Sequence, residues 1–159
     1  SAKIVRANPN ICAKAGKSIT ALAFGKNAGE VEKNSVKQIF STIGETIECE
    51  EKYFNAITAV SGSGPAYYYY FTQELASAGE ENGLPKDVSE KLARLTLSGA
   101  GALAQESKES MRELIDLIAT PGGTTQAGLA ELKKPLPQAM KETVKAAKKR
   151  SGELGNEVR

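Results

Sequence analysis

Residues 120–125 combine threonine and glycine in the pattern of an anion-binding turn. They stand directly before a helical run, so they mark a helix start, where backbone N–H groups have no partner within the helix and attract anions. Glycine lets a ligand come close to the backbone, and threonine hydroxyls both donate and accept hydrogen bonds. The run therefore predicts a site for a small carboxylate, with an ordinary helix cap in a tight turn as the alternative. Its members are Thr120, Pro121, Gly122, Gly123, Thr124 and Thr125.

A second glycine-rich corner, at residues 61–65, reads Ser-Gly-Ser-Gly-Pro and separates two helical segments. Its backbone can contact a ligand, or the corner can be a kink that lets helices pack closely. A third small-residue run, from Gly99 to Ala104, formally satisfies G-x-G-x-x-[GA], but it lies inside an amphipathic helical pattern and not after a strand. We therefore interpret this third run as a helix-packing seam.

The chain lacks histidine, which excludes Ser-His-Asp and Cys-His catalysis and the usual zinc sites within it. Its two cysteines, Cys12 and Cys49, make neither a disulfide framework nor a four-ligand metal site. Glu48, Glu50 and Glu51 are typical of a solvated strand end, so no metal is predicted, although Glu51 can serve as a polar contact. Chemistry in this chain must therefore use backbone amides, hydroxyls, carboxylates, lysines or a bound cofactor.

Charge and hydropathy argue against two classes of partner. The net charge of +2, from 21 basic and 19 acidic residues, gives no long-range field for nucleic acid or an anionic membrane surface. No apolar run approaches the roughly 18 residues of a membrane-spanning helix, and nothing resembles a signal peptide. The predicted location is the cytoplasm, and neither nucleic acid nor a membrane is a predicted partner.

The first 50 residues alternate between strand-like and helix-like patterns. The predicted strands cover residues 3–7, 18–24 and 46–49. Apolar side chains at helical spacing predict a helix over residues 30–43, with Gly44 as its C-terminal stop. Three strands and one helix do not complete an open sheet, so residues 1–50 look like the end of a larger α/β domain.

From residue 51 onward there is no convincing strand, and glycine and proline fall at plausible helix junctions. Helices are predicted over residues 52–60 and 65–81, along the apolar stripe from Val88 to Leu103, after a capping box at residues 110–113, from about Pro121, and over residues 137–150. Residues 151–159 are predicted to be frayed. The fold class is therefore mainly α: a helical domain over residues 51–159 preceded by a small α/β remnant.

Four consecutive tyrosines, Tyr67 to Tyr70, are followed by Phe71 and have high strand propensity. Tyr67, Phe71 and Leu75 nevertheless begin a helical stripe, and we predict a helix. Four adjacent tyrosines point around the whole helix circumference, which favours burial on several sides. Together with the small-residue seam of residues 98–104, this predicts a helix-swapped homodimer.

Three of these features, in this order, resemble the pyrroline-5-carboxylate reductase family. Residues 56–67 resemble the signature that opens the family's helical domain, Gly83-Leu84-Pro85 matches its next helix junction, and residues 120–125 resemble its substrate loop. Residues 3–10 resemble a late strand and turn of its cofactor domain, so the similarity spans about residues 2–154.

The resemblance implies two domains and an activity. Residues 1–50 would be the end of a Rossmann-type dinucleotide-binding domain, and residues 51–159 an all-helical substrate-binding and dimerisation domain. The implied reaction is reduction of the cyclic imine 1-pyrroline-5-carboxylate to L-proline with NAD(P)H, the last step of proline biosynthesis, in a homodimer or a higher oligomer.

The resemblance also implies roles for individual residues. Thr125 would be the catalytic residue, with its hydroxyl bonded to the ring nitrogen of the substrate. The implied substrate-binding residues are Thr120, Gly122, Gly123, Thr124, Thr125 and Glu51. The implied contacts to the cofactor, NADP or NAD, are Asn10, Gly64, Pro65 and Asp116.

The chain departs from the family pattern at three places. Leu117 follows Asp116 where the family often has asparagine or glutamine, and Ile11-Cys12 follows Asn10 where it often has Thr-Pro. The strand and glycine-rich turn that grip the pyrophosphate are absent, so the chain alone is predicted to be inactive. Two alternatives remain: a stand-alone carboxylate-binding dimer without redox activity, and a related imine or β-hydroxyacid reductase.

Overall fold

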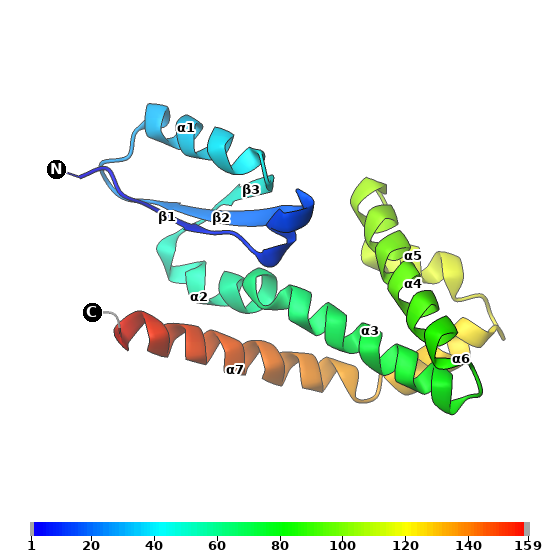
Figure 1. Ribbon diagram of the computed structural model, residues 1–159. Coiled ribbons are helices and arrows are strands. Elements are labelled where there is room, and N and C mark those ends of the chain that lie inside the picture. Colours follow the sequence, from blue (N-terminus) through cyan, green and yellow to red (C-terminus); the bar gives the residue numbers. More distant parts are fainter. Residues whose placement is uncertain (1, 158–159) are drawn as a thin grey trace. The chain divides into compact units, whose positions relative to one another are not determined.

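The structure is a computed structural model that describes residues 2–157. By their contacts the described residues form two compact units. The first contains the residues up to Ala66 together with those from Lys141 onward, and the second is Tyr67–Met140. The elements are labelled in Figure 1, and each unit is described by itself.

A three-stranded sheet organises the first unit, in the order β1-β2-β3. β1 (Val5–Asn8) pairs antiparallel with β2 (Ser18–Phe24), and β2 pairs parallel with β3 (Gly44–Glu48). Parallel neighbours need a crossover, which α1 (Glu30–Ser41) provides. The predicted middle strand is confirmed, whereas the short 3-10 helix η1 (Ile11–Ala15) between β1 and β2 was not predicted.

Gly44 has a different role from the predicted helix stop. α1 is capped at Thr42, and Gly44 is the first residue of β3, with φ +145. A Cβ at Gly44 would lie 2.0 Å from the carbonyl oxygen of Ser18 on the neighbouring strand. Glycine is therefore required here by the approach of two strands and not by the end of the helix.

Two helical segments cover the two faces of the sheet, as Figure 1 shows: α1 lies on one side and α2 (Phe54–Ile57) on the other. Phe54 is buried against Ala21 and Ala23 of β2. Phe24, one position further along the alternating strand, faces α1, where the Lys33 ammonium lies 5.4 Å from its ring centroid. Both faces of β2 are therefore covered: Ala21 and Ala23 are buried on the α2 side, and Thr20 and Leu22 are buried on the α1 side.

The last helix, α7 (Leu136–Glu157), extends well beyond the predicted end at residue 150, so the expectation of a frayed tail was wrong up to Glu157. Residues 158 and 159 lie outside the described part of the chain. Arg150 pairs with Glu153 and Glu157 along the helix. The Ser151 hydroxyl also donates to Asn55 Oδ1 at 2.9 Å, which ties this end of α7 to α2.

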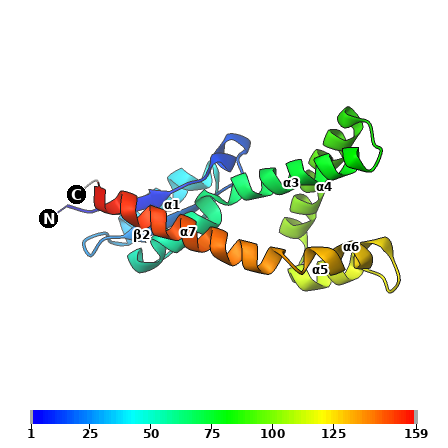
Figure 2. The same ribbon diagram turned by 90° about the horizontal axis from the view of Figure 1, so that it is seen from below.

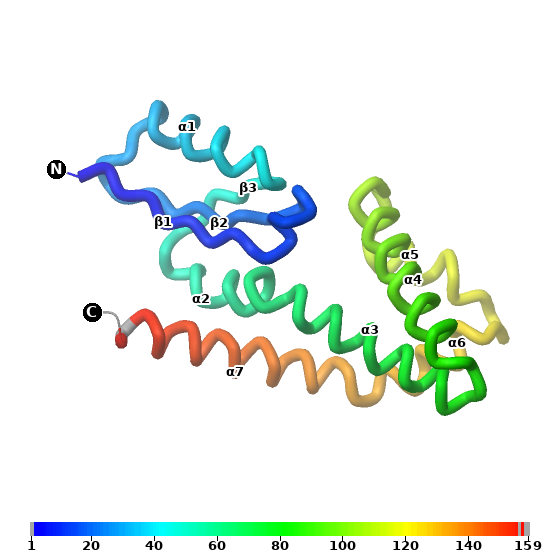
Figure 3. Tube along the Cα trace, viewed as in Figure 1, coloured from blue at the N-terminus to red at the C-terminus, as the bar shows by residue number. Residues whose placement is uncertain are grey.

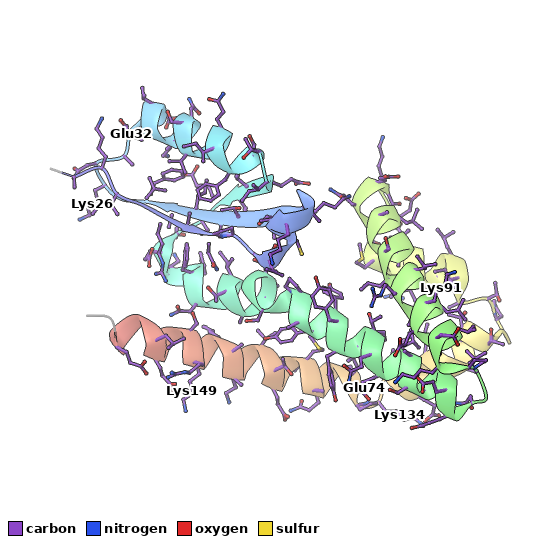
Figure 4. All side chains as sticks on the ribbon, viewed as in Figure 1. Lys26, Glu32, Glu74, Lys91, Lys134 and Lys149 are labelled. Carbon is purple, nitrogen blue, oxygen red and sulfur yellow. The ribbon has the colours of Figure 1, made fainter. Side chains whose placement is uncertain are left out.

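Figures 1 and 2 show the C-terminal half of α7 beside α2 in both views. Lys149 points outward from the helix in Figure 4. The bond between Ser151 and Asn55 explains why α7 continues past residue 150, because a terminal helix docked on the rest of its unit does not fray.

The second unit contains most of α3 (Gly64–Glu81) followed by α4 (Lys86–Glu106), α5 (Met111–Ile118) and α6 (Thr124–Leu132). The predicted junction between α3 and α4 is confirmed, with Gly83 at φ +95. Close to it, buried Ser89 donates to the carbonyl oxygen of Ala76 at 2.7 Å. A Cβ at Gly79 would lie 2.1 Å from the Ser89 hydroxyl, so glycine is what allows α3 and α4 to approach here.

The tyrosine run is helical, as predicted, and lies within α3. Tyr68, Tyr69 and Tyr70 are more than half exposed in the single chain. Leu95 of α4 is likewise 60% exposed. The helices therefore leave apolar side chains uncovered.

In the described part of the chain, no helix combines the length and apolar character needed to cross a bilayer.

Candidate functional site

The turn before α6 is built around two glycines. Gly122 adopts φ +73, a left-handed conformation that favours glycine. Gly123 is the N-cap of α6, and a Cβ there would lie 2.6 Å from the Thr120 hydroxyl. The helix begins at Thr124, three residues later than predicted, because residues 121–123 form the turn itself.

Two amides of this turn are already used inside the protein. The Gly123 N–H donates to the Thr120 carbonyl oxygen at 2.9 Å, and the Gly122 N–H donates to Gln126 Oε1 at 2.8 Å. Within residues 2–157, the structure gives no hydrogen-bond acceptor for the N–H groups of Thr124 and Thr125. These two amides are therefore available to an incoming anion.

The charges around the start of α6 also favour binding of an anion by the Thr124 and Thr125 amides. The first turn of α6 carries no acidic side chain, so no carboxylate of its own competes for the positive end of the helix. Thr120 and Thr124 are exposed and Thr125 is half-buried. The arrangement can hold a small carboxylate by two amides and place a hydroxyl beside it.

Asp116 lies in the same unit as this turn, on α5. Its carboxylate is 3.8 Å from Arg112 Nε, one helical turn away, and both side chains are mostly exposed. The next residue, Leu117, presents an apolar side chain that is 70% exposed. A polar contact at this place can come from Asp116 and not from its neighbour.

Glu51 lies in the first unit, on the 3-10 helix η2 (Glu51–Tyr53). Its carboxylate pairs with the Arg6 guanidinium, which in turn stacks over the Phe54 ring at 4.0 Å from the centroid. Glu51 also lines a hollow of about 410 Å³ that includes Cys49. Burial, together with the Glu51 carboxylate, raises the pKa of the Cys49 thiol, so it stays protonated at neutral pH and is a poor nucleophile.

Asn10 is fixed in place by three hydrogen bonds of 3.1 Å. Its backbone N–H donates to the Ser18 hydroxyl, and its side-chain oxygen accepts from the Cys12 N–H. Its side-chain nitrogen donates to the Ser61 carbonyl oxygen. The structure thus brings Asn10 against the glycine-rich corner that precedes Gly64 and Pro65.

That corner is a turn of π-helix, η3 (Thr58–Gly62), closed by the Ser63 N–H donating to the Thr58 carbonyl oxygen at 2.9 Å. Gly64 and Pro65, at the start of α3, are buried. The Ser61 hydroxyl is buried and has no hydrogen-bond partner among residues 2–157. A neutral, unpaired hydroxyl beside an asparagine suits a neutral amide such as the carboxamide of a nicotinamide, so these residues fit that end of the cofactor.

The predicted site residues therefore fall into two groups, one in each unit. Asn10, Gly64, Pro65 and Glu51 lie in the first unit, whereas Asp116 and residues 120–125 lie in the second. No group of three or more cysteine, aspartate or glutamate side chains is placed to hold a metal ion within the described residues.

Three residues of the first unit that contact this group were given no role by the sequence: Arg6, Asn8 and Thr58. Asn8 Nδ2 donates to the Thr58 hydroxyl at 2.9 Å. The sequence contains a pattern that could have indicated Arg6 and Asn8. Alternate residues of a strand point to the same side, and Arg6, Asn8 and Asn10 are two positions apart.

Comparisons with known proteins point to one family. The profile described as pyrroline-5-carboxylate reductase dimerisation matches residues 51–154. The chain is 41% identical to the pyrroline-5-carboxylate reductase of Synechocystis over 153 residues, which is 96% of this chain and 57% of that protein. It is 37% identical to pyrroline-5-carboxylate reductase 1 of Bacillus subtilis, over 98% of this chain and 52% of that protein.

Solved structures agree. The pyrroline-5-carboxylate reductase of Coxiella burnetii superposes with a TM-score of 0.93 at 32% identity, covering 96% of this chain and 57% of that one. The Plasmodium falciparum enzyme, solved with NADP bound, superposes with a TM-score of 0.86 at 34% identity, covering 96% and 62%.

The chain thus spans little more than half the length of these relatives. The profile match covers most of the chain, and the helical elements it spans are those that carry the candidate residues of the second unit. The chain belongs to the pyrroline-5-carboxylate reductase family.

Proposed function

We propose that the protein carrying this chain reduces the cyclic imine 1-pyrroline-5-carboxylate to L-proline with NADPH or NADH, as the last step of proline biosynthesis. In this proposal the chain supplies the substrate-binding and dimerisation part of a cytoplasmic homodimer. The observation that carries the proposal is that the amides of Thr124 and Thr125, at the start of α6, have no acceptor among the residues that the structure describes. The names of the relatives support the choice of substrate.

In the proposed site the substrate carboxylate is held by the Thr124 and Thr125 amides and by the Thr120 hydroxyl. Gly122 provides the left-handed turn. The Gly123 amide can join once it gives up its bond to the Thr120 carbonyl oxygen. An anion at a helix start is stabilised by the helix dipole, which draws the substrate to this end of α6.

The Thr125 hydroxyl is proposed to accept the N–H of the protonated imine and so to orient the ring. A bound nicotinamide supplies the hydride that reduces the C=N bond. A protonated imine is already electrophilic, so holding the ring nitrogen and its proton in place is sufficient, and the absence of histidine is no obstacle.

The remaining predicted residues are proposed to lie on the cofactor side or beside the substrate. Asn10, Gly64 and Pro65 would face the nicotinamide, for which the unpaired Ser61 hydroxyl is the fitting neighbour. Asp116 would add a polar contact to the cofactor. Glu51, neutralised by Arg6, would be a polar neighbour of the substrate.

The test is a substrate comparison with the complete protein. Purified protein is assayed with NADPH and 1-pyrroline-5-carboxylate, and in parallel with open-chain ketoacids. Turnover of the pyrroline acid, with L-proline identified as the product, is expected. Turnover restricted to ketoacids would replace the proposal by the related β-hydroxyacid reductase.

A further inference from the structure

A row of three side chains on β1 and the turn after it faces a row on the helical segment that follows the sheet. Arg6, Asn8 and Asn10 are two residues apart, so they share one side of an extended backbone. Their partners Phe54, Thr58 and Ser61 are four and three residues apart, which places them on one face of a helix. Figure 3 shows the end of β1 beside this coil.

The outer contacts of the row belong to residues already assigned to the site. Arg6 stacks on Phe54 and pairs with Glu51 at one end, and Asn10 holds the Ser61 carbonyl oxygen at the other. The middle contact, between Asn8 and Thr58, includes no residue to which a role in the site has been assigned. This contact can therefore act on the site only through η3, which begins at Thr58.

The chemistry of the middle contact requires asparagine as a donor. The Thr58 hydroxyl gives its single proton to the Phe54 carbonyl oxygen at 2.9 Å, so it can only accept from Asn8 Nδ2. Both side chains are partly buried. The contact does not require glycine at position 62, because a Cβ there would be at ordinary van der Waals distance, 3.4 Å from Thr58 Cγ2 and 3.6 Å from Asn8 Nδ2.

The contact sits where the helix departs from α geometry. Thr58 begins the π-helical turn, and its own carbonyl oxygen accepts from the Ser63 N–H. A π turn is rare compared with a continuous α-helix, and such turns are frequently found at functional sites. An outside donor fixed on its first residue holds that turn in register, and with it the position of Ser61, Gly64 and Pro65.

We propose that Asn8 is a positioning residue for the nicotinamide side of the site: by holding the Thr58 hydroxyl it fixes the π-helical turn that presents the Ser61 corner to the cofactor. The inference rests on the proposed function, since it takes this corner to be the nicotinamide wall. It adds to that function a residue two positions from Asn10 that itself touches neither ligand.

The test measures NADPH binding in the complete protein, without imine substrate, by the fluorescence of the bound nicotinamide. Asn8→Asp keeps the shape and removes the donor, and Thr58→Val keeps the shape and removes the acceptor. Each change is expected to raise the Kd for NADPH roughly two- to tenfold, the effect of one lost hydrogen bond. The double variant should bind no more weakly than either single variant, because both remove the same contact.

Two controls separate positioning from a general loss of stability. Thr58→Ser keeps the hydroxyl and should bind NADPH as the wild type does. Asn34→Asp makes the same chemical change at an exposed place on α1 and should leave the Kd unchanged. At saturating NADPH, the KM for the imine is expected to stay near the wild-type value in all variants, because the contact between Asn8 and Thr58 includes none of the residues proposed to hold the substrate.

Unchanged Kd values in Asn8→Asp and Thr58→Val would overturn the inference, and so would effects that multiply in the double variant. If Asn8→Asp does not fold, Thr58→Val and Thr58→Ser decide the outcome. A wild-type protein that binds NADPH but does not reduce the pyrroline acid would sink only the proposed substrate. A wild-type protein that does not bind NADPH or NADH would sink both proposals.

Discussion

At the scale of single residues, the proposed chemistry depends on a few hydrogen-bonding groups whose partners can be traced. In the turn before α6 the N–H groups of Gly122 and Gly123 have acceptors within the protein, whereas those of Thr124 and Thr125 have none among the described residues. In the first unit, both polar atoms of the Asn10 side chain are bonded to the protein: its nitrogen donates to the Ser61 carbonyl oxygen, and its oxygen accepts from the Cys12 N–H. The first arrangement leaves donors free for the proposed substrate, and the second fixes Asn10 against the Ser61 corner.

Thr125→Ala in the complete enzyme removes the hydroxyl proposed to orient the ring nitrogen. We expect kcat/KM for the pyrroline acid to fall by the equivalent of roughly 0.5–3 kcal/mol, the value of one hydrogen bond to a charged or neutral partner. Steady-state kinetics measures it. Thr42→Ala is the matched control, because the Thr42 hydroxyl only bonds the carbonyl oxygen of Ile39 at the end of α1. Equal kinetics in the two variants would remove Thr125 from the site.

Gly123→Ala should damage the site through shape. The new methyl group would lie 2.6 Å from the Thr120 hydroxyl and 3.1 Å from its carbonyl oxygen, so Thr120 must move. A displacement of this kind is expected to lower kcat/KM roughly tenfold to a hundredfold.

Gly128→Ala is the matched control for this change. Gly128 lies within α6, and nothing is within 4 Å of the position its Cβ would take. This variant should keep its kinetics and gain about 0.5–1 kcal/mol of stability from the better helix former. A Gly123→Ala enzyme with wild-type KM and kcat would show that the turn tolerates the extra atom and does not contact substrate.

At the scale of elements, local signals predicted where most helices and strands lie. The capping box at the start of α5 is present: the Ser110 hydroxyl accepts from the Glu113 N–H, and Glu113 Oε2 accepts from the Ser110 N–H. The predicted β2 and the helical tyrosine run are also present. The differences are the start of α6, the end of α7, the part played by Gly44 and the short helix η1, which was not predicted.

Ser110→Ala removes the cap of α5, and we expect it to lower the free energy of unfolding by about 0.5–2 kcal/mol at neutral pH. Urea unfolding followed by circular dichroism measures it. Ser35→Ala is the control, because the Ser35 hydroxyl bonds only the carbonyl oxygen of Val31 inside α1. A loss no larger than that of Ser35→Ala would mean that the cap contributes nothing.

The contribution of this cap should depend on pH in one direction. Hydrogen bonds from the Ser110 hydroxyl and backbone N–H hold the pKa of Glu113 below its ordinary value of 4.5. A carboxyl whose pKa is lowered by folding stabilises the folded state fully above its unfolded pKa, and this stabilisation disappears as the pH falls through the folded pKa. The difference in unfolding free energy between wild type and Ser110→Ala should therefore be constant from pH 7 to about 5 and shrink below that. A difference that grows on acidification contradicts this assignment.

At the scale of the whole molecule, the single chain leaves many large apolar side chains exposed on its helices. An isolated soluble chain rarely leaves extended apolar surface uncovered, which supports the proposed homodimer. The match to a dimerisation profile covers the same helices. In the proposed homodimer a second copy of this chain covers this apolar surface. A measurement of the mass in solution tests this.

Leu95→Glu should dissociate the proposed dimer, because it buries a charge at an apolar contact. Leu95 lies on α4 and is 60% exposed, and Ile39 on α1 is equally exposed at 63%. Analytical ultracentrifugation at micromolar concentration should give a dimer for the wild type and for Ile39→Glu. For Leu95→Glu the dimer should be weakened more than about tenfold. A monomeric wild type would contradict the homodimer.

What the sequence determined by itself was local. The alternation in residues 18–24, the capping box and the stripe through the tyrosines each involve residues within a few positions of one another, and backbone hydrogen bonding over the same short range makes them strand or helix. The family followed from three such features in order.

Only the tertiary structure decided which side chains meet. Asn8 and Thr58 are 50 positions apart, and Asn55 and Ser151 are 96 apart. It also decided which amides of the turn before α6 are already used. No local pattern encodes these contacts, because they arise when segments far apart in the chain bury their apolar faces together and the polar groups caught at the boundary must find partners there.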